Sequence, residues 1–278
     1  MFLQQFELER VSLIMRVALG IEYSGENYCG WQRQKHSPSV QENLEKVLSQ
    51  IAAQPIKVFC AGRTDTGVHA TGQVVHFDMQ SLRPESAWLR GANNYLPNDI
   101  SIVWAKEVDD NFHARFSAGS RSYRYIIQNS ETPAATLSGK VTWHRNLLNI
   151  DCMQKGAEHL IGKHDFSSFR ASSCQANTSI RTIERIQIER QNNLIFIDIK
   201  ANAFLHHMVR NIVGCLLRVG EEREKPKFVE IILAGRDRTK APDTAKPNGL
   251  YLVNVGYPAE HFIPTNNIAP LGFSLLSA

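Results

Sequence analysis

Apolar and polar positions alternate along several stretches of the chain. From residue 13 to 23 every odd position is apolar, and the apolar side chains of 73–79 again fall on one face. A period of two places successive side chains on opposite faces of a strand, so each stretch is predicted to be a strand with a buried face. By this criterion, and by a hairpin signal at 191–193, we predict strands over 13–23, 55–60, 73–79, 100–104, 122–128, 183–189, 194–201 and 250–255.

Other stretches carry apolar residues three or four positions apart, which is the spacing of a helix face. After Ser37 and Pro38, which offer an N-cap and a first-turn proline, the side chains of Val40, Leu44 and Leu48 form such a stripe. Glycines follow three of these stretches as stop signals. We predict helices over 40–51, 85–95, 151–161, 203–219 and 226–235.

Strands mixed with one long and one shorter helix occur in both parts of the chain. We therefore predict an α+β fold: a mixed, mainly antiparallel β-sheet flanked by helices, in two pseudo-equivalent α/β halves that meet near residues 105–120. Residues 24–37 are predicted to form a loop with Trp31 exposed. The predicted parts are an N-terminal extension over 1–12, an N-terminal half over 13–112, a C-terminal half over 113–258 and a C-terminal tail over 259–278.

The composition is that of a soluble globular protein. Of the 278 residues, 43% are hydrophobic and 21% are charged, and no window approaches the run of ~18 apolar residues that a membrane span needs. The 31 cations against 27 anions give a net charge of +4, which is a weak lean towards a polyanionic partner. Five widely spaced cysteines without a CxxC pair, and a first segment without the features of a leader, predict a cytoplasmic protein.

The segment 60–77 carries the most informative chemistry. Strand alternation breaks there into a glycine-rich loop that holds Arg63, Asp65 and His69, and glycines let a backbone approach a ligand closely. A loop aspartate is more often a turn residue than a catalyst. The neighbouring Arg63, however, would keep the carboxylate ionised, as a nucleophile or base requires. Asp65 is therefore the candidate catalytic residue, whereas His69 and the loop threonines are interpreted as structural.

A second segment, 112–125, interleaves arginines with aromatic rings. Cations that meet phosphates, beside rings that stack on unpaired bases, are typical of single-stranded RNA recognition. The alternative is an antiparallel strand with Tyr123 and Tyr125 in the core and the arginines in solvent. The RNA-binding candidates of this segment are Phe112, His113, Ala114, Arg115, Phe116, Arg121 and Arg124.

A third segment, 203–214, lies on the predicted helix 203–219. Arg210 falls at the margin of the apolar stripe, where a nearly buried cation needs an anion, and Asp65 is a possible partner. The adjacent His206 and His207 suggest metal ligands, but neighbouring side chains diverge on a helix, so we predict no metal site. The glycine motifs that bind nucleotide phosphates are absent from the sequence, so no nucleotide cofactor is expected.

Five separate motifs together resemble one known family, the tRNA pseudouridine synthase A family (the TruA family of pseudouridine synthases). They are YSGENYCGWQ at 23–32, CAGRTDTGVHA at 60–70, FHARF at 112–116, FLHHMVRNIVG at 204–214 and GLYL at 249–252. The resemblance covers about residues 13–258. One departure is Thr66, which stands where many relatives have alanine, and we expect it to leave the activity intact.

The resemblance implies an isomerase that converts uridine to pseudouridine in the anticodon stem-loop of tRNA, at positions about 38, 39 and 40, an RNA target read largely by shape. It also implies an enzyme without cofactor or metal. A homodimer is implied as well, with each tRNA bridging both subunits, and an RNA-binding cleft between the two halves of the fold.

Carried over residue by residue, the resemblance makes Asp65 the catalytic nucleophile and Arg210 its ion-pair partner. Tyr123 would pack on the target base and assist proton removal. Arg63 would help to hold the flipped-out nucleotide, and Leu250 would form an apolar wall. A uracil that is detached and turned over must be retained, which suits an apolar and aromatic pocket.

Two other classes of protein are weighed against this hypothesis. A non-catalytic RNA-binding protein could keep the fold and the basic, aromatic surface, but it could lose any of Asp65, Tyr123 and Arg210, and all three are present. A metal hydrolase that uses His206, His207 and Asp65 is disfavoured by the divergence of neighbouring helical side chains.

Overall fold

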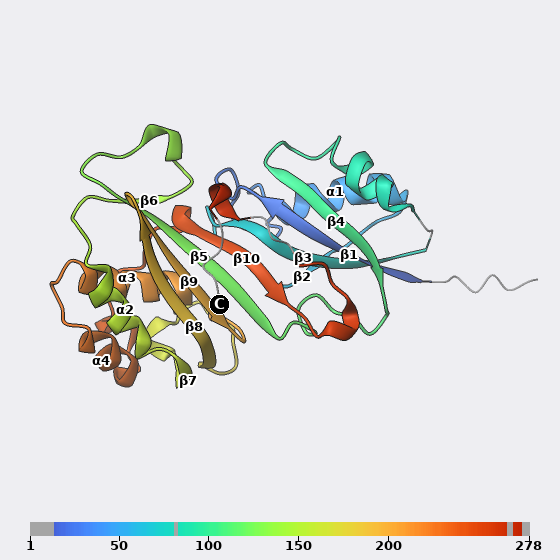
Figure 1. Ribbon diagram of the computed structural model, residues 1–278. Coiled ribbons are helices and arrows are strands. Elements are labelled where there is room, and N and C mark those ends of the chain that lie inside the picture. The colour runs from blue at the N-terminus through green and yellow to red at the C-terminus, as the bar shows by residue number, and fades with distance from the viewer. Residues whose placement is uncertain (1–13, 81–82, 266–268, 274–278) are drawn as a thin grey trace, which may run out of the picture.

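One β-sheet runs through the computed structural model (Figure 1), which describes residues 14–80, 83–265 and 269–273. The predicted extension 1–12 and part of the predicted tail lie outside the described residues. The strands are β1 (Met15–Tyr23), β2 (Phe59–Cys60), β3 (His69–Met79), β4 (Ile100–Val108), β5 (Ser120–Asn129), β6 (Thr142–His144), β7 (Gly162–Asp165), β8 (Ile180–Gln191), β9 (Leu194–Ala201) and β10 (Leu250–Gly256). The helices are α1 (Val40–Ala52), α2 (Ile150–Glu158), α3 (Met208–Gly220) and α4 (Lys227–Gly235), with a π-helical turn over Ala87–Ala92.

The strand order joins an N-terminal and a C-terminal group of strands. Along the sheet the order is β4-β1-β3-β10-β5-β9-β8-β7, with β2 paired to β3 and β6 paired to β5. Among the described strands, β3–β10 and β5–β6 pair in parallel and the other pairs are antiparallel. The β3–β10 pairing is short, with Tyr251 opposite His69 and Leu252 opposite Ala70. These two residue pairs form the seam between the groups.

The central strand β5 has two buried faces with different contents. Tyr123 lies opposite Leu252 of β10 and Ile199 of β9, whereas the next residue, Arg124, lies opposite Tyr251 and Asp198. Successive side chains of a strand point to opposite faces, so Tyr123 and Arg124 face apart.

The helices cover the sheet in two places. In Figure 1, α1 lies beside the N-terminal strands, while α2, α3 and α4 group near β8 and β9. The Ser39 side chain accepts a hydrogen bond from the Glu42 N–H at the start of α1, and Asn149 caps α2 in the same way, which satisfies donors that a helix leaves free. The large core extends through both groups of strands, and a smaller apolar cluster around Ile126 and Phe196 lies on the other face of β5.

The predicted fold class is confirmed, with differences at element ends. The helix predicted over 203–219 begins at Met208, and the helix predicted over 151–161 ends at Glu158. Gly162, with φ of 103°, opens β7 instead of stopping a helix. Trp31 is 1% exposed, so the prediction that it lies in solvent is wrong. No helix in the described ranges has the length and apolar character to cross a membrane.

Candidate active site

Asp65 lies in the loop between β2 and β3, and its neighbours fix that loop. The Thr64 hydroxyl is 2.7 Å from the Tyr23 hydroxyl, and the Thr64 carbonyl accepts a hydrogen bond from the Trp31 N–H at 3.0 Å. Gly30 makes this approach possible, because its φ is 88° and a Cβ there would lie 2.7 Å from the Thr64 carbonyl oxygen. The structural role predicted for Thr64 is confirmed.

His69, at the start of β3, supports the backbone around the seam. Its Nδ1 accepts a hydrogen bond from the Gly25 N–H at 3.1 Å, and its Nε2 lies 3.0 Å from the Asn248 carbonyl oxygen. The ring stacks on Tyr251 at a centroid distance of 4.6 Å. Burial lowers the pKa of His69 to about 4, so the imidazole is neutral near neutral pH. The structural interpretation of His69 is confirmed.

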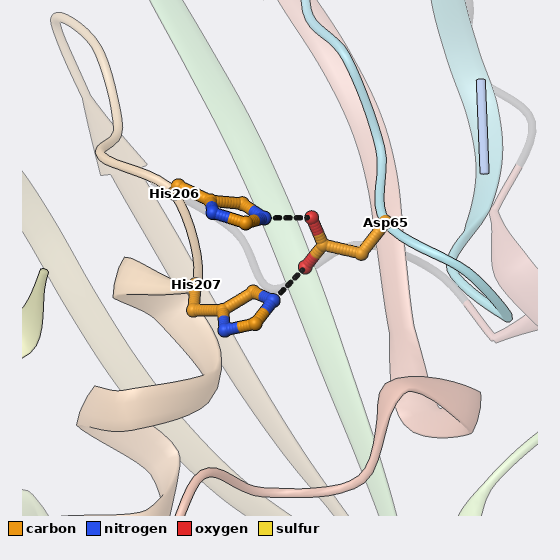
Figure 2. A group of neighbouring side chains, drawn as sticks. All are labelled: Asp65, His206 and His207. Atoms are coloured by element: carbon orange, nitrogen blue, oxygen red, sulfur yellow. Dashed lines mark ion pairs between the residues drawn. The ribbon is translucent and has the colours of Figure 1, made fainter. Parts of the chain in front are cut away.

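The Asp65 carboxylate is surrounded by three nitrogen-bearing side chains from the α3 region. Arg210 Nη1 is 3.1 Å from Oδ2, His206 Nε2 is 3.2 Å from Oδ1, and His207 Nε2 is 3.5 Å from Oδ2. Figure 2 shows both imidazole rings pointing at the two carboxylate oxygens. A guanidinium stays protonated in proteins, so Asp65 is paired with a permanent positive charge, and the predicted Asp65–Arg210 pair is present.

The convergence of the two histidines overturns the geometric reason for dismissing them. His206 and His207 precede α3, which begins at Met208, and His207 has φ of 62° and ψ of 3°. This left-handed conformation turns the chain, so neighbouring side chains need not diverge as they do on a helix. The apolar stripe of the sequence continues back to 203, so it gives no signal that the helix begins only at Met208.

Arg210 also makes hydrogen bonds to the loop that carries Ala245. Its Nε donates to the Ala245 carbonyl at 2.8 Å, and the Ala245 N–H donates to the Arg210 carbonyl at 3.1 Å. The loop that carries Ala245 packs tightly on α3, because a Cβ at Gly214 would lie 2.0 Å from the Asp243 carbonyl oxygen. These contacts therefore hold the Arg210 guanidinium in place beside Asp65.

The wall beside this cluster is aromatic and apolar. Tyr123 of β5 is 8% exposed and meets Phe204 edge-on at a centroid distance of 5.0 Å. Leu250 is buried at the start of β10, two residues from Leu252, which lies opposite Tyr123. Leu250 and Leu252 therefore share the face of the sheet that carries Tyr123. The electrostatic influence of Asp65 on Tyr123 places the ring and the carboxylate near each other.

Arg63 takes a different position from the one that its nearness in sequence suggested. It is exposed, and within the described ranges the ion pairs of Asp65 run to His206, His207 and Arg210. The inference that Arg63 supplies the charge next to Asp65 is therefore wrong for the geometry described. The cation comes from α3, on the other side of the seam.

The segment 112–116 divides into buried and exposed residues. Phe112 and Ala114 are 0% exposed, so the prediction that these two side chains contact RNA is wrong. The segment is a turn between β4 and β5 in which alternate residues point into the core. Phe116 is 76% exposed, Arg115 is exposed and His113 is half-buried, so these three remain accessible to a ligand.

Arg121 and Arg124, the two predicted RNA-binding arginines of β5, make hydrogen bonds within the protein. Arg121 donates to the carbonyls of Ala118, Asn202, Ala61 and Arg115.

Arg124 is 0% exposed, so its predicted contact with RNA is wrong. Its Nε and Nη2 each lie 2.7 Å from an oxygen of Asp198, and its Nη1 donates to the Phe273 carbonyl. The alternation that puts Tyr123 in the site turns Arg124 to the opposite, covered face.

The chain is similar to known proteins over most of its length. A family model described as tRNA pseudouridine synthase matches residues 20–117 and 157–258. A tRNA pseudouridine synthase A of Colwellia psychrerythraea is 52% identical over 257 residues, covering 92% of this chain and 99% of that protein. One of Shewanella woodyi is 54% identical over 258 residues, covering 92% and 98%.

Among solved structures, the archaeal box H/ACA sRNP Nop10-Cbf5 complex contains a chain that matches with a TM-score of 0.33 and 10% identity. That match covers 72% of this chain and 44% of the other, and the likeness is too weak to support a conclusion. The curated relatives, in contrast, cover 92% of the chain, and the family model matches two long segments of it. The chain therefore belongs to the tRNA pseudouridine synthase family of isomerases.

Proposed function

We propose that this protein isomerises uridine to pseudouridine in the anticodon stem-loop of tRNA, at positions about 38 to 40, with Asp65 as the nucleophile. Family membership supports the reaction and the tRNA substrate. The observation that carries the residue assignment is the Asp65 carboxylate, paired with Arg210 at 3.1 Å beside the buried Tyr123.

The reaction needs a negative group that faces the reacting sugar or base. The bond between C1′ and N1 breaks, a bond between C1′ and C5 forms, a proton leaves C5 and a proton arrives at N1. Asp65 acts as a carboxylate in each path open to it: attack at C1′, stabilisation of a cationic sugar on the way to a glycal, or attack at C6. Arg210 then holds the carboxylate in position through a guanidinium that stays protonated.

Tyr123 is assigned to the target base. Burial raises the pKa of Tyr123 above its usual range, and the negative charge of Asp65 raises this pKa further. The hydroxyl therefore stays protonated near neutral pH. The main contribution of Tyr123 is the packing of its ring on uracil. The hydroxyl assists proton removal when it passes its own proton to another group. Leu250 completes the apolar wall, which suits retention of a detached base.

The accessible cations and rings are assigned to the rest of the RNA. Arg63 and Arg115 are exposed and can meet phosphates, while Phe116 can stack on an unpaired base. A cytoplasmic homodimer that works without cofactor or metal belongs to the same proposal. Light scattering on the purified protein tests the dimer, and activity in a chelating buffer tests the independence from metal.

The test maps pseudouridine in unmodified tRNA after incubation with purified protein in a chelating buffer. Wild type is expected to modify the anticodon stem-loop, and Asp65→Asn to give no product while it still binds tRNA, because the amide keeps the size but loses the charge. Asp109→Asn is the matched control, since Asp109 is exposed at the end of β4 and should leave the product unchanged.

Two outcomes would count against the proposal. Binding of tRNA without product by wild type would favour the non-catalytic RNA-binding alternative. Undiminished product from Asp65→Asn would remove Asp65 from the mechanism and leave the isomerase assignment in place. A product at other tRNA positions would correct the target only.

A further inference from the structure

Asp65, His206 and His207 form a cluster with the chemistry of a transition-metal site. One ligand atom from each residue lies within 4.8 Å of the others. Bonds of about 2.0 to 2.2 Å to a tetrahedral zinc ion place ligand atoms roughly 3.3 to 3.6 Å apart. His206 Nε2 lies 3.2 Å from Oδ1 of Asp65 and His207 Nε2 lies 3.5 Å from Oδ2, so each imidazole is close to that spacing from one carboxylate oxygen.

A second contact orients one of the two rings. Ser173 Oγ lies 3.1 Å from His206 Nδ1, the ring nitrogen that faces away from Asp65. A histidine that binds a metal through Nε2 usually donates its Nδ1–H to such an oxygen, which fixes the tautomer and leaves the Nε2 lone pair free for the ion. The Ser173 contact therefore suits His206 as a ligand.

The cluster is open to an ion from solution. The side chains of His206, His207 and Asp65 are 39%, 29% and 21% exposed. The Arg210 guanidinium, 3.1 Å from Asp65 Oδ2, opposes a second positive charge. An ion must therefore gain enough binding energy from the two imidazoles to offset that repulsion. Zinc and copper bind imidazole well, whereas magnesium and calcium prefer oxygen ligands, so the site favours zinc or copper.

We propose that Asp65, His206 and His207 bind a divalent transition-metal ion, represented by Zn²⁺, and that this ion inhibits the enzyme. The inhibition rests on the proposed function, because an ion on the Asp65 carboxylate neutralises the charge that the reaction needs. The binding itself rests on the three side chains alone. The protein then works in a chelating buffer and loses activity as free zinc rises.

The first arm of the test measures metal binding without RNA. Protein stripped with a chelator is titrated with Zn²⁺ against a chromophoric chelator. One ion is expected at this site, and His206→Gln and His207→Asn should each weaken it by at least about tenfold. Asparagine is used at position 207 because it tolerates the left-handed backbone. Thermal unfolding checks that each variant is folded, and zinc should raise the midpoint of wild type more than that of either variant.

Two variants serve as matched controls. His159→Gln removes a histidine on α2 that pairs with Glu230 instead of Asp65. Cys174→Ser removes a potential zinc ligand whose Sγ accepts a hydrogen bond from the His206 N–H. Both are expected to bind zinc as wild type does. Equal affinity in His206→Gln, His207→Asn and wild type would overturn the proposal, and so would loss of zinc in Cys174→Ser alone.

The second arm measures pseudouridine formation at increasing free Zn²⁺ or Mg²⁺. Half-inhibition is expected at the zinc concentration that half-saturates the site, with reversal by chelator and no inhibition by Mg²⁺. Full activity with the site saturated would overturn the inhibitory role. If wild type forms no pseudouridine under any condition, the proposed function fails, and the binding arm still decides whether the metal site exists.

Discussion

Two arginine–aspartate pairs of the described residues, Arg124–Asp198 and Arg210–Asp65, differ in how completely each is closed. Arg124 and Asp198, on β5 and β9, share two contacts of 2.7 Å with side chains 0% and 10% exposed. Arg210 and Asp65 share one contact of 3.1 Å with side chains 13% and 21% exposed. The first pair joins neighbouring strands, whereas the second joins a helix to a loop across the seam.

The difference separates a structural pair from one that can act. A bidentate pair without solvent access has its donors and acceptors occupied, so neither partner can turn to a substrate. Asp65 keeps a partly solvent-accessible carboxylate, and its other neighbours are the imidazoles of His206 and His207. Asp65 can therefore exchange contacts with an incoming nucleotide, while Asp198 cannot do so without breaking the sheet.

The largest expected effect breaks the closed pair. Arg124→Ala should lower the free energy of unfolding by about 3 to 5 kcal/mol, because it removes the guanidinium that contacts both carboxylate oxygens of the buried Asp198. Urea denaturation measures this loss. The double variant Arg124→Met with Asp198→Leu should recover much of it, since a buried pair can be replaced by apolar side chains at little cost. A loss below about 1 kcal/mol would mean that solvent reaches the pair.

Breaking the open pair should affect catalysis more than folding. Arg210→Ala is expected to lower kcat by about 100-fold, or ~3 kcal/mol, because the carboxylate loses its fixed counter-charge. Because both partners are partly exposed, the unfolding free energy should fall by only about 1 to 2 kcal/mol. Single-turnover kinetics and urea denaturation give the two numbers. Arg210→Lys is the control that keeps the charge but not the guanidinium geometry. A stability loss equal to that of Arg124→Ala would erase the distinction between the pairs.

Acid should weaken the face that carries the closed pair. His69 stacks on Tyr251, which lies opposite Arg124 in register, and burial lowers the pKa of His69 from 6.5 to about 4. The unfolded chain therefore binds more protons between these two values, so stability is present above pH 6.5 and falls as the pH drops towards 4. We expect a contribution of roughly 1 to 3 kcal/mol.

The difference in unfolding free energy between wild type and His69→Gln isolates this contribution. It should shift in favour of the variant as the pH falls, because glutamine has no proton to bind. The measurement runs from neutral pH to about pH 4.5, roughly half a unit above the pKa of His69 in the folded state. A difference that stays constant over this range would show that folding does not lower the pKa of His69.

The smallest expected effect concerns Phe116, an exposed residue of the segment before β5. Phe116→Ala should weaken tRNA binding about fivefold, or ~1 kcal/mol, because an exposed ring can stack on a base. Filter binding at fixed salt measures it. Phe262→Ala is the matched control, since Phe262 is 75% exposed in a different segment. Equal losses in the two variants would point to a general effect of surface aromatic residues.

Periodicity in the sequence predicted the sheet because apolar residues alternate along strands such as β1. Of the two alternatives left open for the segment 112–125, the structure agrees with the one that places Tyr123 and Tyr125 in the core. Periodicity could not place Arg124, because β5 is covered on both faces and the covering partner, Asp198, lies 74 positions away. On a strand covered on both faces, a side chain that points away from one core enters another buried layer. The pattern of apolar and polar positions does not distinguish such a buried side chain from one that points into solvent.

The residues alone made Asp65 a possible partner of Arg210, and the family resemblance implied the pair, whereas backbone conformation decided the part of the site that was missed. A cation on an apolar stripe needs an anion, which indicated the Asp65–Arg210 pair before its geometry was known. The apolar stripe also extended the helix back to 203, and only the left-handed His207 shows that the helix starts later. That single backbone conformation brings both histidines to Asp65.

The short seam between β3 and β10 has a consequence for the newly synthesised chain. Asp65 precedes the seam and Arg210 lies 145 positions later, so translation delivers the carboxylate long before its counter-ion. β10, which carries the second side of the seam, follows later still. A ribosome-bound chain that ends before Arg210 carries the aspartate loop without its guanidinium. The site is therefore completed only after the ribosome has passed β10.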